Sequence, residues 1–223
     1  MGLLVNKRDI RATAAMLPAF EILMNIKNYL FIKRCLDIGV SALMIAGVLS
    51  WLLPLLALLI KLDSRGPLFF LQKRSGKGGK LFTCYKLRTM VVNRLADEAP
   101  ASENDPRITR MGKILRKTHL DELPQLFNVL LGSMSLVGPR PYMMSDDRKF
   151  SMIVSNHYFR CLVKPGITGL AQVKGLHGVW PDERTVVDRH RWDAFYIRHV
   201  CLLMDLRIIR QTFLLIFTKK RPI

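Results

Sequence analysis

The sequence predicts an α+β protein that is mainly helical, with a re-entrant membrane helix, amphipathic interfacial helices and a small β-hairpin. Three observations support this prediction: a charge-free apolar segment interrupted by a proline, two short β-like runs around a glycine-rich turn, and long stretches with helical character. The chain of 223 residues has room for one domain of ordinary size and a membrane element.

Composition points to a membrane surface or to phosphate-bearing substrates. Half of the residues are hydrophobic, and 35 Lys and Arg against 17 Asp and Glu leave a net charge of +18. A disordered chain is excluded, because such chains lack the apolar residues for a core. Apolar and strongly basic character together indicate anionic lipids, phosphates, or both. Nucleic acid is the rival partner, but we expect none, because no row of stacking aromatic residues and no reading motif accompanies the basic residues.

Segment 1–32 is predicted to be an amphipathic segment at the membrane interface. Its apolar stretch is broken by Pro18, Glu21 and Lys27, and no small-residue cleavage site follows a compact apolar core. This pattern argues against a cleaved signal peptide and favours a helix that lies on the membrane surface.

Segment 33–62 is predicted to be a re-entrant membrane helix. The 23 residues from Ile38 to Ile60 carry no charge, enough to cross a hydrocarbon core of about 30 Å at about 1.5 Å per residue. A buried core helix is the alternative, but such helices are rarely so long and so apolar all round. Pro54 lies inside the run, where it removes a backbone hydrogen bond and kinks the helix.

The flanks of this segment favour re-entry over a straight crossing. Residues 61–88 carry eight Lys or Arg and one Asp, and residues 1–37 carry six Lys or Arg and three acids. Since both flanks are basic, the positive-inside rule places both in the cytoplasm. The four cysteines are far apart and form no CxxC pair, which fits reduced thiols in a cytosolic setting.

A β-hairpin should follow the membrane segment. Leu68–Gln72 and Leu81–Leu87 have β-like composition, and the sequence between them, Ser-Gly-Lys-Gly-Gly, is a turn signal. A period of two places Lys86 and Arg88 on the same face of the second strand. That face is either a solvated charged surface or a wall that faces phosphate.

Residues 111–131 are predicted to be helical, in two segments. Thr118 with Asp121 resembles a capping box, and Pro124 fits close to a helix start. Either interpretation places Asp121 and Glu122 at a helix N-terminus. Gly132 should end the second helix.

The remaining chain contains two stiff turns, at 138–141 and 164–169, and a C-terminal helical region at 192–217. Charged residues interrupt the apolar face of that region too often for a membrane crossing, so we expect an interfacial helix. Residues 33–217 are predicted to form one domain, and 218–223 a basic tail.

An adjacent pair of carboxylates is a weak signal by itself, because Asp-Glu pairs often serve only the helix dipole. Here Arg116 and Lys117 precede Asp121 and Glu122, and Arg140 follows in a tight turn. Two carboxylates among many cations suit divalent-metal and phosphate chemistry.

Long motifs in this region resemble the signature of the bacterial sugar transferases, the monotopic phosphoglycosyl transferases. The resemblance covers roughly residues 31–217 in the family's order. Its longest runs are Thr-His-Leu-Asp-Glu-Leu-Pro-Gln-Leu-Phe-Asn-Val-Leu at 118–130, Met-Ser-Leu-Val-Gly-Pro-Arg-Pro at 134–141, and Lys-Pro-Gly-Ile-Thr-Gly-Leu-Ala-Gln-Val at 164–173.

The resemblance implies transfer of a sugar-1-phosphate from a UDP-sugar to a polyprenyl phosphate such as undecaprenyl phosphate, with release of UMP. This reaction is the first membrane step of exopolysaccharide or glycoconjugate synthesis. The resemblance also implies Mg²⁺ as cofactor and a helix broken at a proline, with the protein on the cytoplasmic face of the bacterial inner membrane. An apolar interfacial surface makes a homo-oligomer a further expectation.

Carried over by residue, Asp121 would be the nucleophile that forms an acyl-phosphate intermediate. Glu122 would be the second member of the pair, and both carboxylates are the expected Mg²⁺ ligands. Arg88 and Arg140 would bind phosphates. Lys86 and Gln125 are further phosphate or substrate ligands, with a structural role as the alternative.

Two departures from the family pattern stand out. The helix break reads Leu53-Pro54 instead of Ser-Pro, and leucine has no hydroxyl for a carbonyl freed by the proline. After Val173 the family commonly has Asn-Gly-Arg, whereas this chain has Lys-Gly-Leu, which leaves the sugar open. The alternative function is a basic, membrane-anchored binding or regulatory protein without catalysis, in which the carboxylates only cap a helix.

Overall fold

The computed structural model describes residues 23–92, 105–176 and 182–218. Most of the predicted segment 1–32 and of the predicted tail 218–223 therefore lies outside the described residues. The described chain is mainly helical and adds two small sheets, in agreement with the predicted class.

The elements follow one another in this order: α2 (Leu23–Met44), a π-helical turn (Ile45–Leu49), α3 (Ser50–Asp63), β1 (Phe69–Ser75), β2 (Leu81–Leu87), α4 (Arg110–Thr118), α5 (Gln125–Leu131), β3 (Ser135–Val137), α6 (Met144–Ile153), β4 (Gly166–Thr168), α7 (Leu170–Val173), α8 (Glu183–Arg198) and α9 (Leu202–Thr218). Short 3₁₀ turns lie at Lys77–Gly79, Leu120–Glu122 and His157–Leu162.

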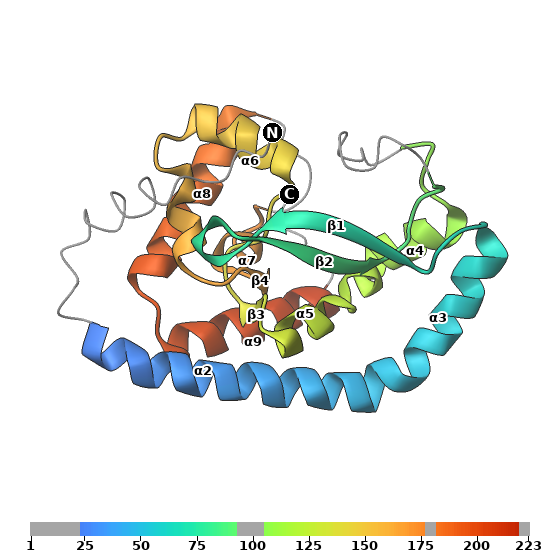
Figure 1. Ribbon diagram of the computed structural model, residues 1–223, viewed down its shortest axis with the longest axis horizontal. Coiled ribbons are helices and arrows are strands. Elements are labelled where there is room, and N and C mark those ends of the chain that lie inside the picture. Colours follow the sequence, from blue (N-terminus) through green and yellow to red (C-terminus); the bar gives the residue numbers. More distant parts are fainter. Residues whose placement is uncertain (1–22, 93–104, 177–181, 219–223) are drawn as a thin grey trace.

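Helices α2 and α3 form one long bent helix that runs beneath and around the rest of the molecule (Figure 1). Lys27–Asp63 is long and apolar enough to cross a membrane, by length and composition. Only 17% of its most apolar window is buried, so the alternative of a soluble core helix does not fit. Large apolar side chains such as Leu43, Trp51 and Leu62 are more than half exposed instead.

The bend coincides with the π-helical turn, which lies just before Pro54. Two side chains that follow this turn donate to carbonyls one turn earlier in the helix. The Ser50 hydroxyl donates to the carbonyl of Ala46 at 2.6 Å, and the Trp51 indole N–H donates to the carbonyl of Gly47 at 2.9 Å. The polar groups of Ser50 and Trp51 are thus paired within the helix itself.

The first half of the long helix is fixed to the globular part by buried polar contacts. Arg34 donates to the carbonyls of Val129 and Leu130 at 2.6 and 2.8 Å, at the C-terminal end of α5. The Asp37 carboxylate accepts from the backbone N–H of Leu136 at 2.9 Å.

Lys33, the residue before Arg34, forms an ion pair with Asp205 of α9 at 2.7 Å. The Tyr196 hydroxyl of α8 donates to the same carboxylate at 2.7 Å. Three helices are therefore joined by one buried network.

The last turn of the long helix is fixed to the same globular part. The Arg88 guanidinium, at the end of β2, donates to the carbonyls of Ser64 and Arg65, each at 2.6 Å. These carbonyls follow the end of α3, where no helical N–H remains to pair with them. Both ends of the apolar segment are consequently held by a single body.

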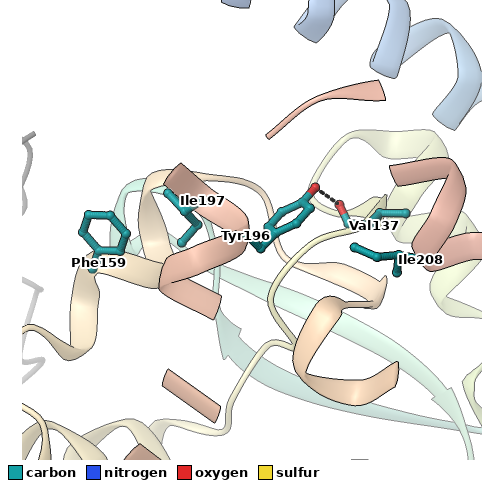
Figure 2. Packing of buried hydrophobic residues seen from close by; sticks show 5 residues of the cluster. All are labelled: Val137, Phe159, Tyr196, Ile197 and Ile208. Atoms are coloured by element: carbon teal, nitrogen blue, oxygen red, sulfur yellow. Dashed lines mark hydrogen bonds between the residues drawn. The ribbon is translucent and has the colours of Figure 1, made fainter. Parts of the chain in front are cut away.

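The C-terminal region is helical as predicted, but it forms two helices instead of one. α8 ends at Arg198 and α9 starts at Leu202, and α9 lies along α2 (Figure 1). Both helices pack into the same core: Tyr196 and Ile197 of α8 and Ile208 of α9 form one buried cluster with Val137 of β3 and Phe159 (Figure 2). The outer face of α9 leaves Leu203, Leu206 and Phe213 exposed, as in an interfacial helix.

The predicted hairpin is confirmed, since β1 and β2 pair antiparallel from Phe69–Leu87 to Ser75–Leu81. The second sheet was not predicted: β3 and β4 pair in parallel over three residues each. Their backbones approach so closely that a Cβ on Gly166 would lie 2.1 Å from the nitrogen of Gly138. The two stiff turns of the sequence thus lie side by side.

Candidate active site

Asp121 and Glu122 lie on the 3₁₀ turn that joins α4 to α5. The predicted capping box is wrong, because Thr118 is the last residue of α4 and its hydroxyl donates back to the carbonyl of Ile114 at 2.8 Å. The chain reverses at His119, which adopts φ 58°. Pro124 then precedes the first turn of α5, so both carboxylates still lie at the entrance to a helix.

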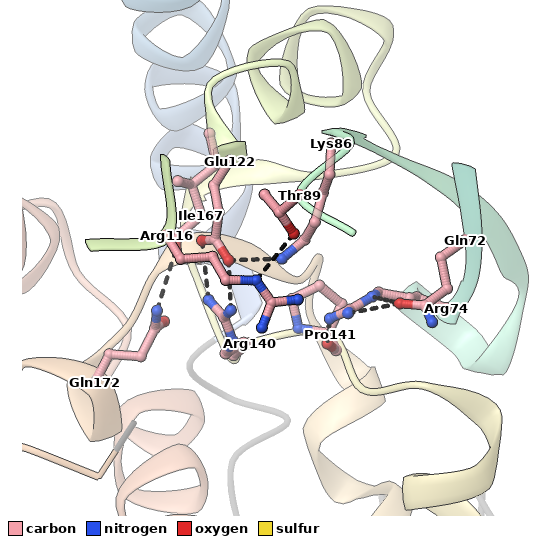
Figure 3. Close-up of polar contacts among 10 residues, drawn as sticks. All are labelled: Gln72, Arg74, Lys86, Thr89, Arg116, Glu122, Arg140, Pro141, Ile167 and Gln172. Atoms are coloured by element: carbon pink, nitrogen blue, oxygen red, sulfur yellow. Dashed lines mark hydrogen bonds and ion pairs between the residues drawn. The ribbon is translucent and has the colours of Figure 1, made fainter. Parts of the chain in front are cut away.

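The two cations that contact Glu122 come from distant parts of the chain. Lys86 of β2 lies 2.6 Å from its carboxylate, and both terminal nitrogens of Arg140 donate to it, at 2.5 and 3.1 Å (Figure 3). Burial by itself raises the pKa of Glu122, but Arg140 and Lys86 outweigh it and hold that pKa well below its usual range. Glu122 is therefore a permanent anion that holds two cations in place.

The surroundings of the Asp121 carboxylate differ from those of Glu122. Its side chain is buried, and within the described part of the chain its carboxylate accepts no hydrogen bond. Burial raises the pKa of Asp121, the Lys86 charge opposes that rise, and the Glu122 charge adds to it. A carboxylate with uncommitted oxygens, bordered by cations, can donate electron density to an electrophile.

Arginines that the sequence did not single out as ligands complete the site. Arg116 donates to the Thr89 hydroxyl at 2.9 Å, and its charge acts on Asp121 (Figure 3). Arg74 donates to the carbonyl of Pro141 at 2.6 Å and shares its face of the hairpin with Lys86. Cross-strand pairing of the period-two faces would have indicated Arg74.

Of the predicted ligands, Arg88 is directed away from the carboxylates. Arg88 shares a strand face with Lys86, but its guanidinium is directed at the end of α3 and donates to backbone carbonyls there. Arg88 thus has structural partners in the backbone, and its binding of phosphate stays a prediction. Gln125 is buried at the first residue of α5, after the carboxylates, and its role is likewise untested.

The donor set limits how a metal ion could be held. The described residues contain no group of three or more His, Cys, Asp or Glu side chains that could hold a metal ion. Mg²⁺ commonly binds one or two carboxylates together with substrate phosphates, and keeps several waters. Asp121, whose oxygens are open, fits that mode, whereas both oxygens of Glu122 are already paired with Lys86 and Arg140.

An apolar hollow of about 420 Å³ lies on the inner side of the helix bend. It is bounded by residues of both halves of the long helix and closed by Phe127 of α5. Phe127 follows the carboxylates by less than two helical turns, so one short stretch of chain carries both a wall of the hollow and the acidic pair.

The family model described as bacterial sugar transferase matches residues 28–219. A Xanthomonas campestris protein named UDP-glucose:undecaprenyl-phosphate glucose-1-phosphate transferase is 42% identical over 187 residues, which cover 82% of this chain and 38% of that protein.

Two further relatives differ in length and in name. A Rhizobium leguminosarum exopolysaccharide production protein is 45% identical, covering 81% of this chain and 92% of that protein. An Aeromonas hydrophila UDP-N-acetylgalactosamine-undecaprenyl-phosphate N-acetylgalactosaminephosphotransferase is 42% identical, covering 85% of this chain and 44% of that protein. The chain thus spans about two fifths of the Xanthomonas and Aeromonas relatives. By the extent of the family match and these identities, the chain belongs to the bacterial sugar transferase family.

Proposed function

We propose that the protein transfers a sugar-1-phosphate from a UDP-sugar to polyprenyl phosphate, with undecaprenyl phosphate as the acceptor and UMP as the released product. The observation that carries this proposal is the carboxylate pair, in which Glu122 holds Lys86 and Arg140 while Asp121 keeps its oxygens open. The names of three relatives at 39–42% identity combine undecaprenyl phosphate with different sugars: glucose, galactose or N-acetylgalactosamine. We therefore leave the sugar unassigned.

The reaction follows in two displacements. An Asp121 oxygen attacks the phosphorus that bears the sugar, and the bond from that phosphorus to the bridging oxygen of UMP breaks. An aspartyl-phosphosugar results. An oxygen of the lipid phosphate then attacks the same phosphorus, and the bond to Asp121 breaks. Lys86, Arg116 and Arg140 lie close enough to the carboxylates to stabilise charge that spreads over the phosphoryl oxygens.

We further propose that Mg²⁺ is held by Asp121 and Glu122 together with phosphate oxygens. When bound, it would supply neutralisation of phosphate charge beyond what the arginines provide. Glu122 also orients the two cations, since both of its oxygens are paired with them.

The long helix is proposed to enter the cytoplasmic leaflet of the bacterial inner membrane and return. Arg34 and Asp37 near its start and Arg88 at its end bind one globular body, so a straight crossing would have to break one of these sets. The exposed apolar faces of the long helix and of α9 supply a common surface for the leaflet. Self-association through such faces remains part of this proposal.

Cysteine labelling tests the topology. In a background in which the four native cysteines are replaced, we expect Val5→Cys and Ser75→Cys both to resist a membrane-impermeant maleimide in intact spheroplasts, and both to react after permeabilisation. Labelling of only one of them before permeabilisation would support a straight crossing and contradict re-entry.

The apolar hollow is proposed to hold the first isoprene units of the acceptor. We expect Ala57→Trp, which fills the hollow, to raise KM for polyprenyl phosphate about tenfold, because it excludes roughly two methylene-sized contacts of about 0.8 kcal/mol each. KM for the UDP-sugar should stay constant. Leu58→Trp is the matched control, since Leu58 is 58% exposed and does not line the hollow. An equal effect of both variants would contradict this placement.

The decisive assay uses purified protein with a UDP-sugar panel, undecaprenyl phosphate and Mg²⁺. UMP release that depends on donor, acceptor and metal supports the transferase. The alternative, a basic membrane-anchored regulatory protein, predicts that lipid binds but no member of the panel releases UMP.

A further inference from the structure

The Arg140 turn is held in place by two other arginines. The turn follows β3 and contains two prolines, which cannot donate backbone hydrogen bonds. Arg160 donates to the carbonyl of Arg140 at 2.6 Å, and Arg74 donates to the carbonyl of Pro141 at 2.6 Å. The backbone position of Arg140 therefore depends on side chains outside the turn.

Arg160 is in turn oriented by groups around it. It pairs with Asp193 of α8 at 3.0 Å, and its guanidinium lies 3.4 Å from the centre of the Tyr142 ring. The side chains of Arg160 and Asp193 are 5% and 4% exposed. A buried ion pair of this kind contributes little net stability, because desolvation offsets the attraction. Its contact with Arg140 suggests a role beyond stability.

We propose that Arg160, oriented by Asp193 and Tyr142, is a positioning residue that sets the place of Arg140 against Glu122. Only the activity measurements that test this inference rest on the proposed transferase function. Within the described residues, Arg160 contacts neither Asp121 nor Glu122, so its influence on the site passes through the Arg140 backbone. A misplacement of about 1 Å in such a site can cost about 10²-fold in rate.

Arg160→Lys is the test variant, because lysine keeps the charge but has no planar guanidinium that can stack on the Tyr142 ring while its Nη2 donates to both Arg140 and Asp193. We expect kcat to fall about ten- to a hundredfold, with KM for the UDP-sugar changed less than about twofold. In a variant that already carries Arg140→Lys, Arg160→Lys should lower kcat little further, since both substitutions act on the contact between Arg140 and Glu122.

His157→Gln is the matched control. His157 lies in the same 3₁₀ segment, is equally buried and pairs with Asp147 at 2.8 Å, yet it makes no hydrogen bond to the turn. It should leave kcat within about twofold even where it lowers the unfolding midpoint as much as Arg160→Lys does. If both variants lose activity in proportion to stability, or if Arg160→Lys and Arg140→Lys multiply, the inference is overturned.

A second measurement does not need catalysis. Arg160→Lys and Glu122→Gln should shift the unfolding midpoint non-additively, because the two residues share Arg140 and no direct contact. Non-additivity in a protein that releases no UMP would retain the positioning role and remove the proposed function. Additive shifts would remove the positioning role whatever the activity.

Discussion

Replacing Asp121 by Asn should abolish UMP release, with a loss of at least about 10³-fold in kcat. The amide has the same shape but no negative charge, so it cannot form the acyl-phosphate bond to the sugar phosphate. UMP release under saturating UDP-sugar, acceptor and Mg²⁺ measures the effect. The unfolding midpoint should not fall, because burial already disfavours the charge at this position.

The control for this variant is another buried carboxyl group. Asp146→Asn removes a side chain that is 6% exposed and whose pKa is also raised by burial, outside the carboxylate pair. It should retain activity. Mass spectrometry of wild-type protein incubated with donor alone should find a sugar phosphate on the peptide that contains Asp121. Turnover by Asp121→Asn, or a modified peptide elsewhere, would contradict the assignment.

Replacing Glu122 by Gln should destabilise the fold by about 3–5 kcal/mol. Lys86 and Arg140 are half-buried around this one carboxylate, and its neutralisation leaves two cations facing each other without an anion between them. Denaturant unfolding of the detergent-solubilised protein measures the loss. Activity should fall as well, since both cations lose the group that orients them.

An exposed ion pair provides the comparison for Glu122. Asp188 lies 3.0 Å from Arg191 on the surface of α8, and Asp188→Asn should cost less than about 1 kcal/mol. Equal effects of the two substitutions would mean that water screens Glu122 as well as it screens Asp188. The idea of Glu122 as a fixed organiser of cations would then fail.

Elements specified by neighbouring residues were predictable from the sequence. The hairpin follows from alternation and a glycine turn, and the end of α5 follows from Gly132, which adopts φ 86°. The proline-broken apolar segment predicted an atypical membrane helix, but not the role of Ser50, whose hydroxyl lies one turn before the proline. Such elements can be predicted because interactions between residues close together in the sequence determine them.

Features that depend on long-range packing were out of reach. β3 and β4 have three residues each, and they pair only because two glycines let distant backbones meet. Strand periodicity placed Lys86 and Arg88 together but could not tell that one contacts Glu122 and the other the end of α3. The motif resemblance indicated Asp121, Glu122 and Arg140 as site residues. The contact between Arg140 and Glu122 could not be predicted, because it depends on how separate segments of the chain fold together.

The bent helix is fixed to the globular part at two places. Arg34 and Asp37 of the helix bind the backbone there, and Arg88 of the globular part binds the carbonyl of Ser64 just after the helix ends. Under the proposed re-entrant placement, both ends of the helix are fixed to the body that carries Asp121 and Glu122, so the height of these carboxylates above the lipid headgroups would follow the depth to which the bend enters the leaflet. In that placement, bilayer thickness and headgroup packing would determine how readily the phosphate of the proposed acceptor reaches Asp121.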